Sequence, residues 1–180
     1  EMTSIERLAD GRWRIGAAVT IGALSRRSEF GPGLEALADS ARLIGSIQVQ
    51  NRASLGGNLC NAAPSADAVP LLFALGAMAE IASASGSRIA PAVTVPTGPG
   101  RVSLVPGEVL TGLVIPVQPA RSAARYLRFT QRREMDIAIA GSGVRLELSS
   151  DGRIVGAAIV LASVAPVPIV SVRAVSMLIG

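Results

Sequence analysis

Histidine and lysine are both absent from the 180 residues, and cysteine occurs once, at Cys60. Without histidine, the chain cannot form a Ser-His catalytic pair or a histidine zinc site. Without lysine, it offers neither a Schiff-base amine nor the lysine of a phosphate-binding P-loop. A single cysteine excludes an intrachain disulfide framework and a cysteine-based metal site. We therefore expect no catalytic residue and no metal ligand on this chain.

Long uninterrupted apolar runs are also missing, although apolar residues make up 49% of the chain. None reaches the roughly 18 residues that a membrane-spanning helix needs. The first 16 residues do not show the basic-then-apolar pattern of a signal peptide. Together with the single cysteine, these observations favour a cytoplasmic protein without a membrane span.

The charge pattern gives little sign of a nucleic-acid partner. All 17 basic residues are arginine, and with 13 acidic residues the formal net charge is +4. The arginines are scattered, and the few aromatic residues do not alternate with them as stacking platforms would. We therefore predict that the protein does not bind nucleic acid.

Apolar spacing indicates a mixture of helices and strands in two lobes, an α+β fold. The first lobe, residues 1–118, ends with a strand that stops at Pro116, and residues 118–125 read as a linker. The second lobe, residues 119–180, begins with a three-stranded meander whose hairpin turn is Ser149–Gly152. The expected segments are a strand from Trp13, a helix over 34–47, a helix starting at Ser65, a strand from Met78, a surface segment over 83–107, strand-like runs over 126–131, 136–148 and 153–164, and a helix starting near Ser171.

One polar stretch, NRASLGGNLCNAAPSAD over residues 51–67, separates a helical segment from an apolar one. We expect an ordered loop, because Gly56 and Gly57 permit a tight turn and successive amides in such a turn can form an anion-binding concavity. Asn58 adds an amide donor, and Asp67 either caps helix amides or accepts from a sugar hydroxyl. A plain Gly-Gly turn with Asp67 beside a helix dipole accounts for the same residues. The spacing is not G-x-G-x-x-G, so a Rossmann fold is disfavoured.

This stretch resembles the second flavin-binding segment of the FAD-carrying medium subunits of molybdenum hydroxylases, which include carbon monoxide dehydrogenase and xanthine dehydrogenase. The family pattern reads approximately N-R-x-[ST]-[IL]-G-G-N, followed by P-x-x-D. The positions that fit it are Asn51, Arg52, Ser54, Leu55, Gly56, Gly57, Asn58, Pro64 and Asp67. Three further stretches are similar to the family: LADGRWRIGAAVTIGAL, PTGPGRVSLVPGEVLTGLVIP and YLRFTQRREMDIAIAGSGVRL. The resemblance covers nearly the whole chain.

The resemblance implies a two-lobe FAD-binding fold of the vanillyl-alcohol-oxidase/PCMH type, and it implies these roles residue by residue. Ser54, Gly57 and Asn58 line the FAD diphosphate, Gly56 is a further cofactor-binding residue, and Asp67 lies near the ribose or the diphosphate. Leu110 lies beside the flavin. Arg128 stands where many members have a lysine near the flavin carbonyl. The positions Arg132, Arg133 and Asp136 match a further motif, for which a salt-bridged structural role is an equal alternative.

The implied function is that of an electron-transfer subunit. FAD on this chain accepts electrons from two [2Fe–2S] clusters on a small subunit, which receive them from a large molybdenum-cofactor subunit. The resemblance also implies that the family's upstream lobe, with a second Gly-Gly loop, is absent here, and that the C-terminal lobe is truncated. Two alternatives remain open: a free-standing flavin oxidoreductase of the same fold, and a cofactor-free assembly module. The hydroxylated substrate and the external electron acceptor stay undetermined.

Overall fold

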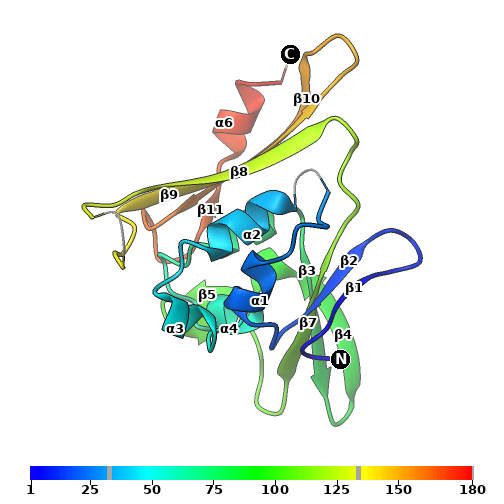
Figure 1. The fold of residues 1–180 in the computed structure, drawn as a ribbon, viewed down its shortest axis with the longest axis vertical. Helices are drawn as coiled ribbons and strands as arrows, with labels where there is room; N and C mark the ends of the chain where they lie inside the picture. The colour runs from blue at the N-terminus through cyan, green and yellow to red at the C-terminus, as the bar shows by residue number, and fades with distance from the viewer. Residues whose placement is uncertain (32–33, 133–134, 180) are drawn as a thin grey trace.

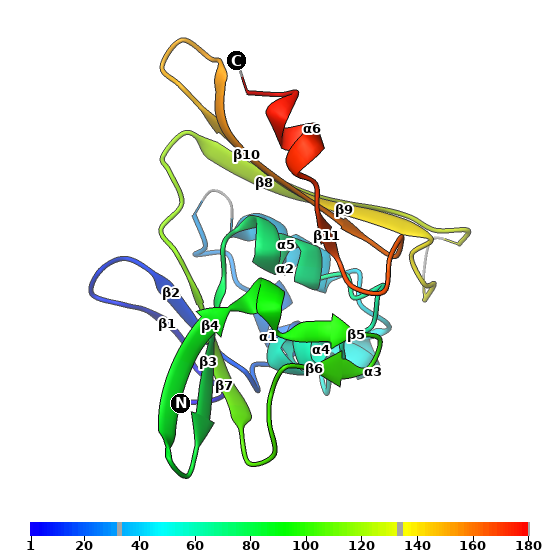
Figure 2. The same cartoon turned by 180° about the vertical axis from the view of Figure 1, so that it is seen from behind.

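The computed structural model describes residues 1–31, 34–132 and 135–179, which form two large antiparallel sheets with helices between them and a small two-stranded sheet (Figures 1 and 2). The first sheet has five strands in the order β1-β2-β7-β3-β4. Its strands are β1 (Ile5–Arg7), β2 (Trp13–Gly16), β3 (Met78–Ser83), β4 (Gly86–Pro91) and β7 (Val109–Ile115). Strand β7 pairs with both β2 and β3. The sheet therefore forms only after β7, which comes late in this part of the chain, has paired with β2 near its start.

The two faces of the first sheet differ in polarity, as the two-residue period of a strand requires. Ile15, Ile81 and Leu113 are fully buried in the main core on the helix-covered face. Arg14 and Glu80 alternate with these residues and lie on the opposite face, where they form an ion pair. Burial of one face sets the strand register, because a slip of one residue would turn the apolar set outward.

Five short helices lie along the chain between β2 and β3: α1 (Ile21–Ser25), α2 (Glu35–Ala41), α3 (Ile47–Gln50), α4 (Leu55–Cys60) and α5 (Val69–Ala74). Each has fewer than eight residues, too short to be stable alone. Their stability therefore comes from packing against neighbouring elements: α4 contacts β7, and α3, which buries none of its residues, contacts α1. Leu37 and Leu72 illustrate this, because both are fully buried in the core.

The second sheet has the order β11-β10-β9-β8. Its strands are β8 (Ser122–Phe129), β9 (Ala140–Leu148), β10 (Ile154–Ala162) and β11 (Ile169–Val170). The helix α6 (Val172–Ser176) follows β11 and contacts β10. The predicted hairpin at Ser149–Gly152 is confirmed, because it joins β9 to β10. The predicted three-strand meander is extended by the two-residue strand β11.

Helix α5 links the second sheet to the rest of the molecule. A Cβ at Gly143 on β9 would lie 2.7 Å from the backbone of Pro70, so the strand approaches the start of α5 where a side chain would clash. The Arg145 Nε also donates to the Ala74 carbonyl oxygen at 3.1 Å. This close approach places β8 and β9 beside α5 (Figure 2).

Several predicted boundaries are wrong. The helix expected over 34–47 ends at Ala41, and α3 begins separately at Ile47. The expected strand from Trp13 ends at Gly16, and β1 was not predicted. Strand β8 begins inside the expected linker, whereas residues 83–107 contain the expected short pieces. These pieces are β4, a 3-10 turn at Ala92–Thr94, β5 (Pro96–Gly98) and β6 (Arg101–Val102).

Candidate functional site

Helix α4 begins at the stretch that the sequence singled out, and its start is tied to the start of α1. Thr20 and Ser54 form an isolated antiparallel bridge, with Ile21 N donating to the Ala53 carbonyl at 2.8 Å and Leu55 N donating to the Val19 carbonyl at 3.1 Å. The Thr20 hydroxyl caps α1 and the Ser54 hydroxyl caps α4. The two helices therefore start side by side from one short ladder.

The prediction of a loop over 51–67 is wrong for its glycines, because Gly56, Gly57 and Asn58 are helical. The amides at the start of α4 are also engaged: Gly56 N donates to the Ala17 carbonyl at 3.1 Å, and Gly57 N donates to the Ser54 hydroxyl at 3.0 Å. Asn58 N donates to the Ser54 carbonyl at 2.9 Å. The expected amide concavity is therefore absent, because helix formation and N-capping use these donors.

The two adjacent glycines have different reasons to lack a side chain. A Cβ at Gly56 would lie 2.6 Å from the Ala17 Cβ and 2.7 Å from the Ala17 carbonyl oxygen. Gly56 thus lets α4 pack directly on the chain that follows β2. A Cβ at Gly57 would meet only the Ser54 Oγ, at 2.9 Å, and would otherwise extend into open space.

That open space is a largely apolar groove of about 340 Å³. It lies between α4, the segment after β2 and the start of β7. Four of the predicted cofactor residues line it: Ser54, Gly56, Gly57 and Leu110. Residues that sequence reasoning did not assign complete the lining: Met2, Ala17, Ala18, Cys60, Leu104, Glu108 and Val109.

Ser54 and Asn58 are the polar side chains of α4 that could hold a ligand. The Ser54 Oγ accepts from Gly57 N, which leaves its own hydrogen available to donate toward the groove. The Asn58 Oδ1 is buried and has no hydrogen-bond partner among the described residues. A buried oxygen without a donor is costly in a folded protein, which is typical of a position completed by a bound molecule.

Glu108 places a carboxylate in the groove wall, and Arg88 holds it there. The Arg88 Nε and Nη2 donate to the two carboxylate oxygens of Glu108 at 2.6 and 2.8 Å, and Val105 N donates at 3.0 Å. The Arg88 hydrogen bonds, followed by the Val105 amide, lower the pKa of Glu108 from 4.5 to about 2. Burial raises the pKa of the neighbouring Cys60 thiol. Neither group is adjusted to exchange protons near neutral pH.

Three predicted cofactor residues, Asn58, Asp67 and Arg128, lie outside this groove lining, and Asp67 and Arg128 contact each other. The Arg128 Nη1 lies 2.9 Å from the Asp67 Oδ2, and the Tyr126 hydroxyl donates to the Asp67 Oδ1 at 2.9 Å. Burial raises the pKa of the Asp67 carboxyl, an effect that Tyr126 and Arg128 oppose. Burial and the Asp67 charge also raise the pKa of Tyr126.

Two sequence assignments near these residues need correction. Ser65 is not an N-cap, because α5 starts at Val69 after Ala68, with Pro70 in its first turn. Asp67 consequently lies before α5, and its carboxylate accepts hydrogen bonds from Tyr126 and Arg128 on β8. Arg132 and Asp136 do form an ion pair, at 3.4 Å, whereas Arg133 lies outside the described residues.

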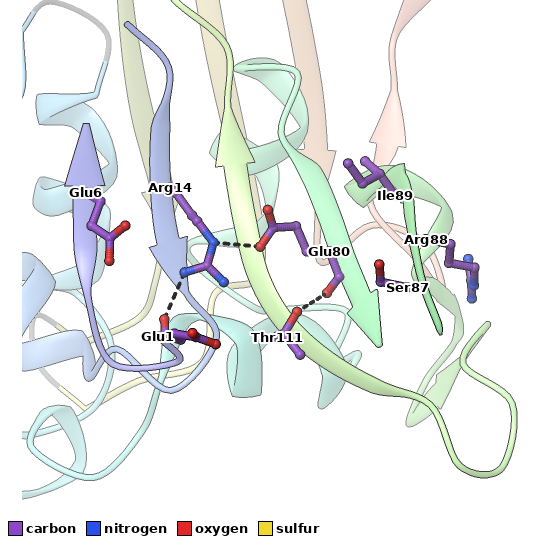
Figure 3. A pocket seen from close by; sticks show the side chains of 8 residues that line it. All are labelled: Glu1, Glu6, Arg14, Glu80, Ser87, Arg88, Ile89 and Thr111. Carbon is purple, nitrogen blue, oxygen red and sulfur yellow. Dashed lines mark hydrogen bonds and ion pairs between the residues drawn. The ribbon is translucent and has the colours of Figure 1, made fainter. Parts of the chain in front are cut away.

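A second, polar pocket lies on the opposite face of the first sheet (Figure 3). There the Arg14 Nε donates to the Glu80 Oε2 at 2.8 Å, across Gly112, whose missing Cβ would lie 2.6 Å from that oxygen. The Arg14 Nη1 donates to the Glu1 carbonyl at 2.8 Å, and the Thr111 hydroxyl to the Glu80 carbonyl at 3.2 Å. Since these groups satisfy one another, the groove beside α4 is the stronger candidate site.

Among residues 1–31, 34–132 and 135–179, no group of three or more histidine, cysteine, aspartate or glutamate side chains could hold a metal ion. Within the same ranges, no helix combines the length and the apolar character needed to cross a membrane.

Comparison with known proteins identifies two consecutive family matches. Residues 1–118 match the FAD binding domain in molybdopterin dehydrogenase, and residues 125–180 match the CO dehydrogenase flavoprotein C-terminal domain. The xanthine dehydrogenase FAD-binding subunit of Escherichia coli O157:H7 is 35% identical over 151 residues, covering 83% of this chain and 52% of that protein. The carbon monoxide dehydrogenase medium chain of Afipia carboxidovorans is 32% identical over 166 residues, covering 92% of this chain and 57% of that protein.

Solved structures agree with these sequence matches. CO dehydrogenase from Oligotropha carboxidovorans superposes with a TM-score of 0.92 at 30% identity, over 99% of this chain and 62% of that chain. Quinoline 2-oxidoreductase from Pseudomonas putida 86 gives a TM-score of 0.85 at 28% identity, over 99% and 61% of the two chains. The chain thus spans between half and two thirds of the length of these relatives. On the strength of the match over residues 1–118 and the identities above 30%, the chain belongs to the family of FAD-binding domains in molybdopterin dehydrogenases.

Proposed function

We propose that the chain binds FAD in the groove beside α4 and serves as the electron-transfer flavoprotein part of a molybdenum hydroxylase complex. The observation that carries this proposal is the gathering of Ser54, Gly56, Gly57 and Leu110 around one groove. These residues come from two motifs more than fifty residues apart, and both motifs belong to the family pattern that resembles a flavin site.

The groove residues fit part of a dinucleotide. Gly57 leaves the wall open where a Cβ would intrude, and Leu110 supplies an apolar surface. The Ser54 hydroxyl can donate to an oxygen of the ligand. Asn58, on the same helix but outside the groove lining, has a buried Oδ1 that no donor among the described residues reaches. When bound, FAD supplies one- and two-electron redox chemistry. This chain's own residues bind it, orient it and exclude water from it.

Electron transfer suits this lining better than catalysis on an organic substrate. A flavin enzyme that removes a proton from its substrate needs a base with a pKa near the working pH. Glu108 is paired with Arg88 and has a pKa of about 2, while burial raises the pKa of Cys60. Outer-sphere electron transfer requires no such group. This disfavours a free-standing flavin oxidoreductase.

The partners are proposed from the relatives. A large molybdenum-binding subunit would hydroxylate the substrate, and a small [2Fe–2S] subunit would pass electrons to FAD. The names of two relatives, carbon monoxide dehydrogenase medium chain and 6-hydroxypseudooxynicotine dehydrogenase complex subunit alpha, describe parts of multi-subunit enzymes. Purification of the intact complex, followed by metal analysis, tests this arrangement. Absence of molybdenum and iron from a flavin-containing preparation would contradict it.

The groove assignment is tested with Gly57→Ala in the intact complex. The added methyl would stand 2.9 Å from the Ser54 Oγ and narrow the groove, whereas alanine suits a helix better than glycine by about 1 kcal/mol. Because the methyl also displaces the Ser54 cap, which offsets this gain, we expect nearly unchanged thermal stability of the flavin-free protein. We expect at least tenfold weaker FAD binding by fluorescence titration. Gly98→Ala is the control, because its Cβ would make only ordinary contacts, at 3.7 Å, with Arg101. Equal FAD affinity in both variants would rule out the groove.

A further inference from the structure

The segment that leaves α4, residues 61–67, is held in one conformation by contacts to distant parts of the chain. Gly100 N donates to the Ala62 carbonyl at 3.2 Å, and Ser163 N donates to the Pro64 carbonyl at 2.9 Å. Ala62 and Ser163 both have positive φ values, of 48° and 68°. Non-glycine residues in this region are strained and persist only where the surrounding structure enforces them. The segment is therefore positioned by its neighbours, not by its own preference.

The strongest of these contacts ends the segment. Asp67 receives a hydrogen bond from Tyr126, 59 residues away, and one from Arg128, 61 residues away. Tyr126 and Arg128 lie on the inner face of β8, and the ion pair is only 9% and 10% exposed on its two sides. A Cβ at Gly141 on β9 would lie 2.5 Å from the Tyr126 hydroxyl, so this glycine provides the space for the phenol ring.

We infer that Tyr126 and Arg128 are positioning residues, which hold Asp67 and thereby fix residues 61–67 and the end of α4 for the cofactor groove. The role of the groove rests on the proposed function, whereas the fixing of the segment rests on these contacts alone. Arg128 acts from the second sheet without lining the groove, so its influence on the ligand passes through Asp67. This differs from the direct flavin contact that the resemblance implies for Arg128.

The energetics of a buried ion pair explain why it selects one arrangement. Removing two charges from water costs about as much as their attraction returns, so the pair adds little net stability. Losing one partner, however, leaves a buried charge without compensation. The segment is therefore held in the single position where Asp67 meets both donors. Replacing both charged groups by amides of similar shape relieves the penalty.

The test uses the intact complex with Arg128→Gln and measures two quantities. Hydrogen exchange reports the opening of residues 55–67, and the rate of FAD release is followed by fluorescence. We expect at least tenfold faster exchange over 61–67 and about tenfold faster FAD release, as for loss of a charged hydrogen bond. Arg125→Gln is the control, because Arg125 is exposed on the opposite face of the same strand, and it should change neither quantity.

Two further variants distinguish positioning from general damage. Arg128→Lys keeps the charge, and the double variant Asp67→Asn/Arg128→Gln removes both charges; each should bring exchange and FAD release back to within about threefold of the wild type. Tyr126→Phe removes one hydrogen bond without changing the ring and should give a smaller effect in the same direction. It serves as the test if Arg128→Gln does not fold.

The outcomes separate this inference from the proposed function. Faster FAD release with unchanged exchange over 61–67 would overturn positioning and favour a direct contact between Arg128 and the cofactor. If both hydrogen exchange over 61–67 and FAD release are unchanged in Arg128→Gln, Arg128 neither positions the segment nor contacts the cofactor. If exchange is faster in Arg128→Gln but the wild-type complex contains no flavin, the positioning of the segment would be supported and the proposed function contradicted.

Discussion

Arg88 on β4 holds both carboxylate oxygens of Glu108, at 2.6 and 2.8 Å, at the point where the chain turns into β7. Glu108 also accepts from Val105 N and donates its own amide to the Val105 carbonyl, so one side chain closes the turn and joins it to the sheet. Leu110 lies two residues further on, in the groove. The Arg88–Glu108 pair thus sets the position of one groove wall.

The first prediction concerns acid stability. The pKa of Glu108 falls from 4.5 to about 2 in the folded protein, so its stabilising effect is complete above about pH 4.5. The effect is lost as the pH falls toward 2, because the unfolded state binds the proton first. Arg88→Gln removes the main cause, and we expect its acid unfolding to begin at a higher pH than in the wild type. Circular dichroism during an acid titration measures the midpoint.

Arg153→Gln is the matched control for this titration. The Arg153–Asp151 pair is 73% and 60% exposed, and such surface pairs contribute little. Its acid midpoint should therefore stay at the wild-type value. Identical midpoints for Arg88→Gln and Arg153→Gln would contradict the assigned role of Arg88.

The second prediction separates the two roles of Ser54. Aspartate is as good an N-cap as serine, so Ser54→Asp should preserve α4 and leave the melting temperature nearly unchanged. Its negative charge would repel the diphosphate and remove the hydroxyl donor. We expect at least tenfold weaker FAD binding, as for loss of a hydrogen bond to a charged group.

Ser54→Ala is the comparison, since it loses the cap and should cost about 1 kcal/mol of stability. Calorimetry gives the melting temperature of each variant, and flavin fluorescence gives the affinity. Full FAD affinity in Ser54→Asp would show that the diphosphate lies elsewhere.

The third prediction concerns Asn58, whose Oδ1 is buried and meets no hydrogen-bond donor in the part of the chain that the structure describes. Asn58→Ala removes this unsatisfied oxygen, so the flavin-free protein should be as stable as the wild type or more stable. The variant should nevertheless gain less from FAD, because ligand stabilisation grows with affinity. The measurement is the shift in melting temperature on adding saturating FAD. An equal shift in variant and wild type would show that Asn58 does not contact the cofactor.

Local sequence was sufficient for elements whose signals lie within a few residues. Ser149–Gly152 carries its own turn chemistry, and the hairpin between β9 and β10 forms there. Sequence motifs alone predict cofactor contacts for Ser54, Gly57 and Leu110, and these residues line one groove. The family itself could be recognised from the spacing of such residues.

Helix boundaries were less predictable, because packing outweighs local preference in such short segments. Gly56-Gly57 is a typical turn signal, yet α4 forms because Ser54 caps it and Gly56 allows contact with Ala17. Ala17 is far from Gly56 in the sequence, so no local pattern predicts their contact. Ser65 has the features of an N-cap, but α5 begins only at Val69.

The residue types on this chain determined by themselves that histidine and lysine chemistry is excluded and that two flavin-type motifs are present. Only the tertiary structure decided what Asp67 and Arg128 contact. Each was assigned to a cofactor from its motif, yet they meet each other across 61 residues, together with Tyr126. A sequence motif specifies the residue type at a position, but it does not specify which distant charged residue contacts that residue in the protein interior. A buried carboxylate must find a compensating partner, and the fold supplies the one that lies within reach.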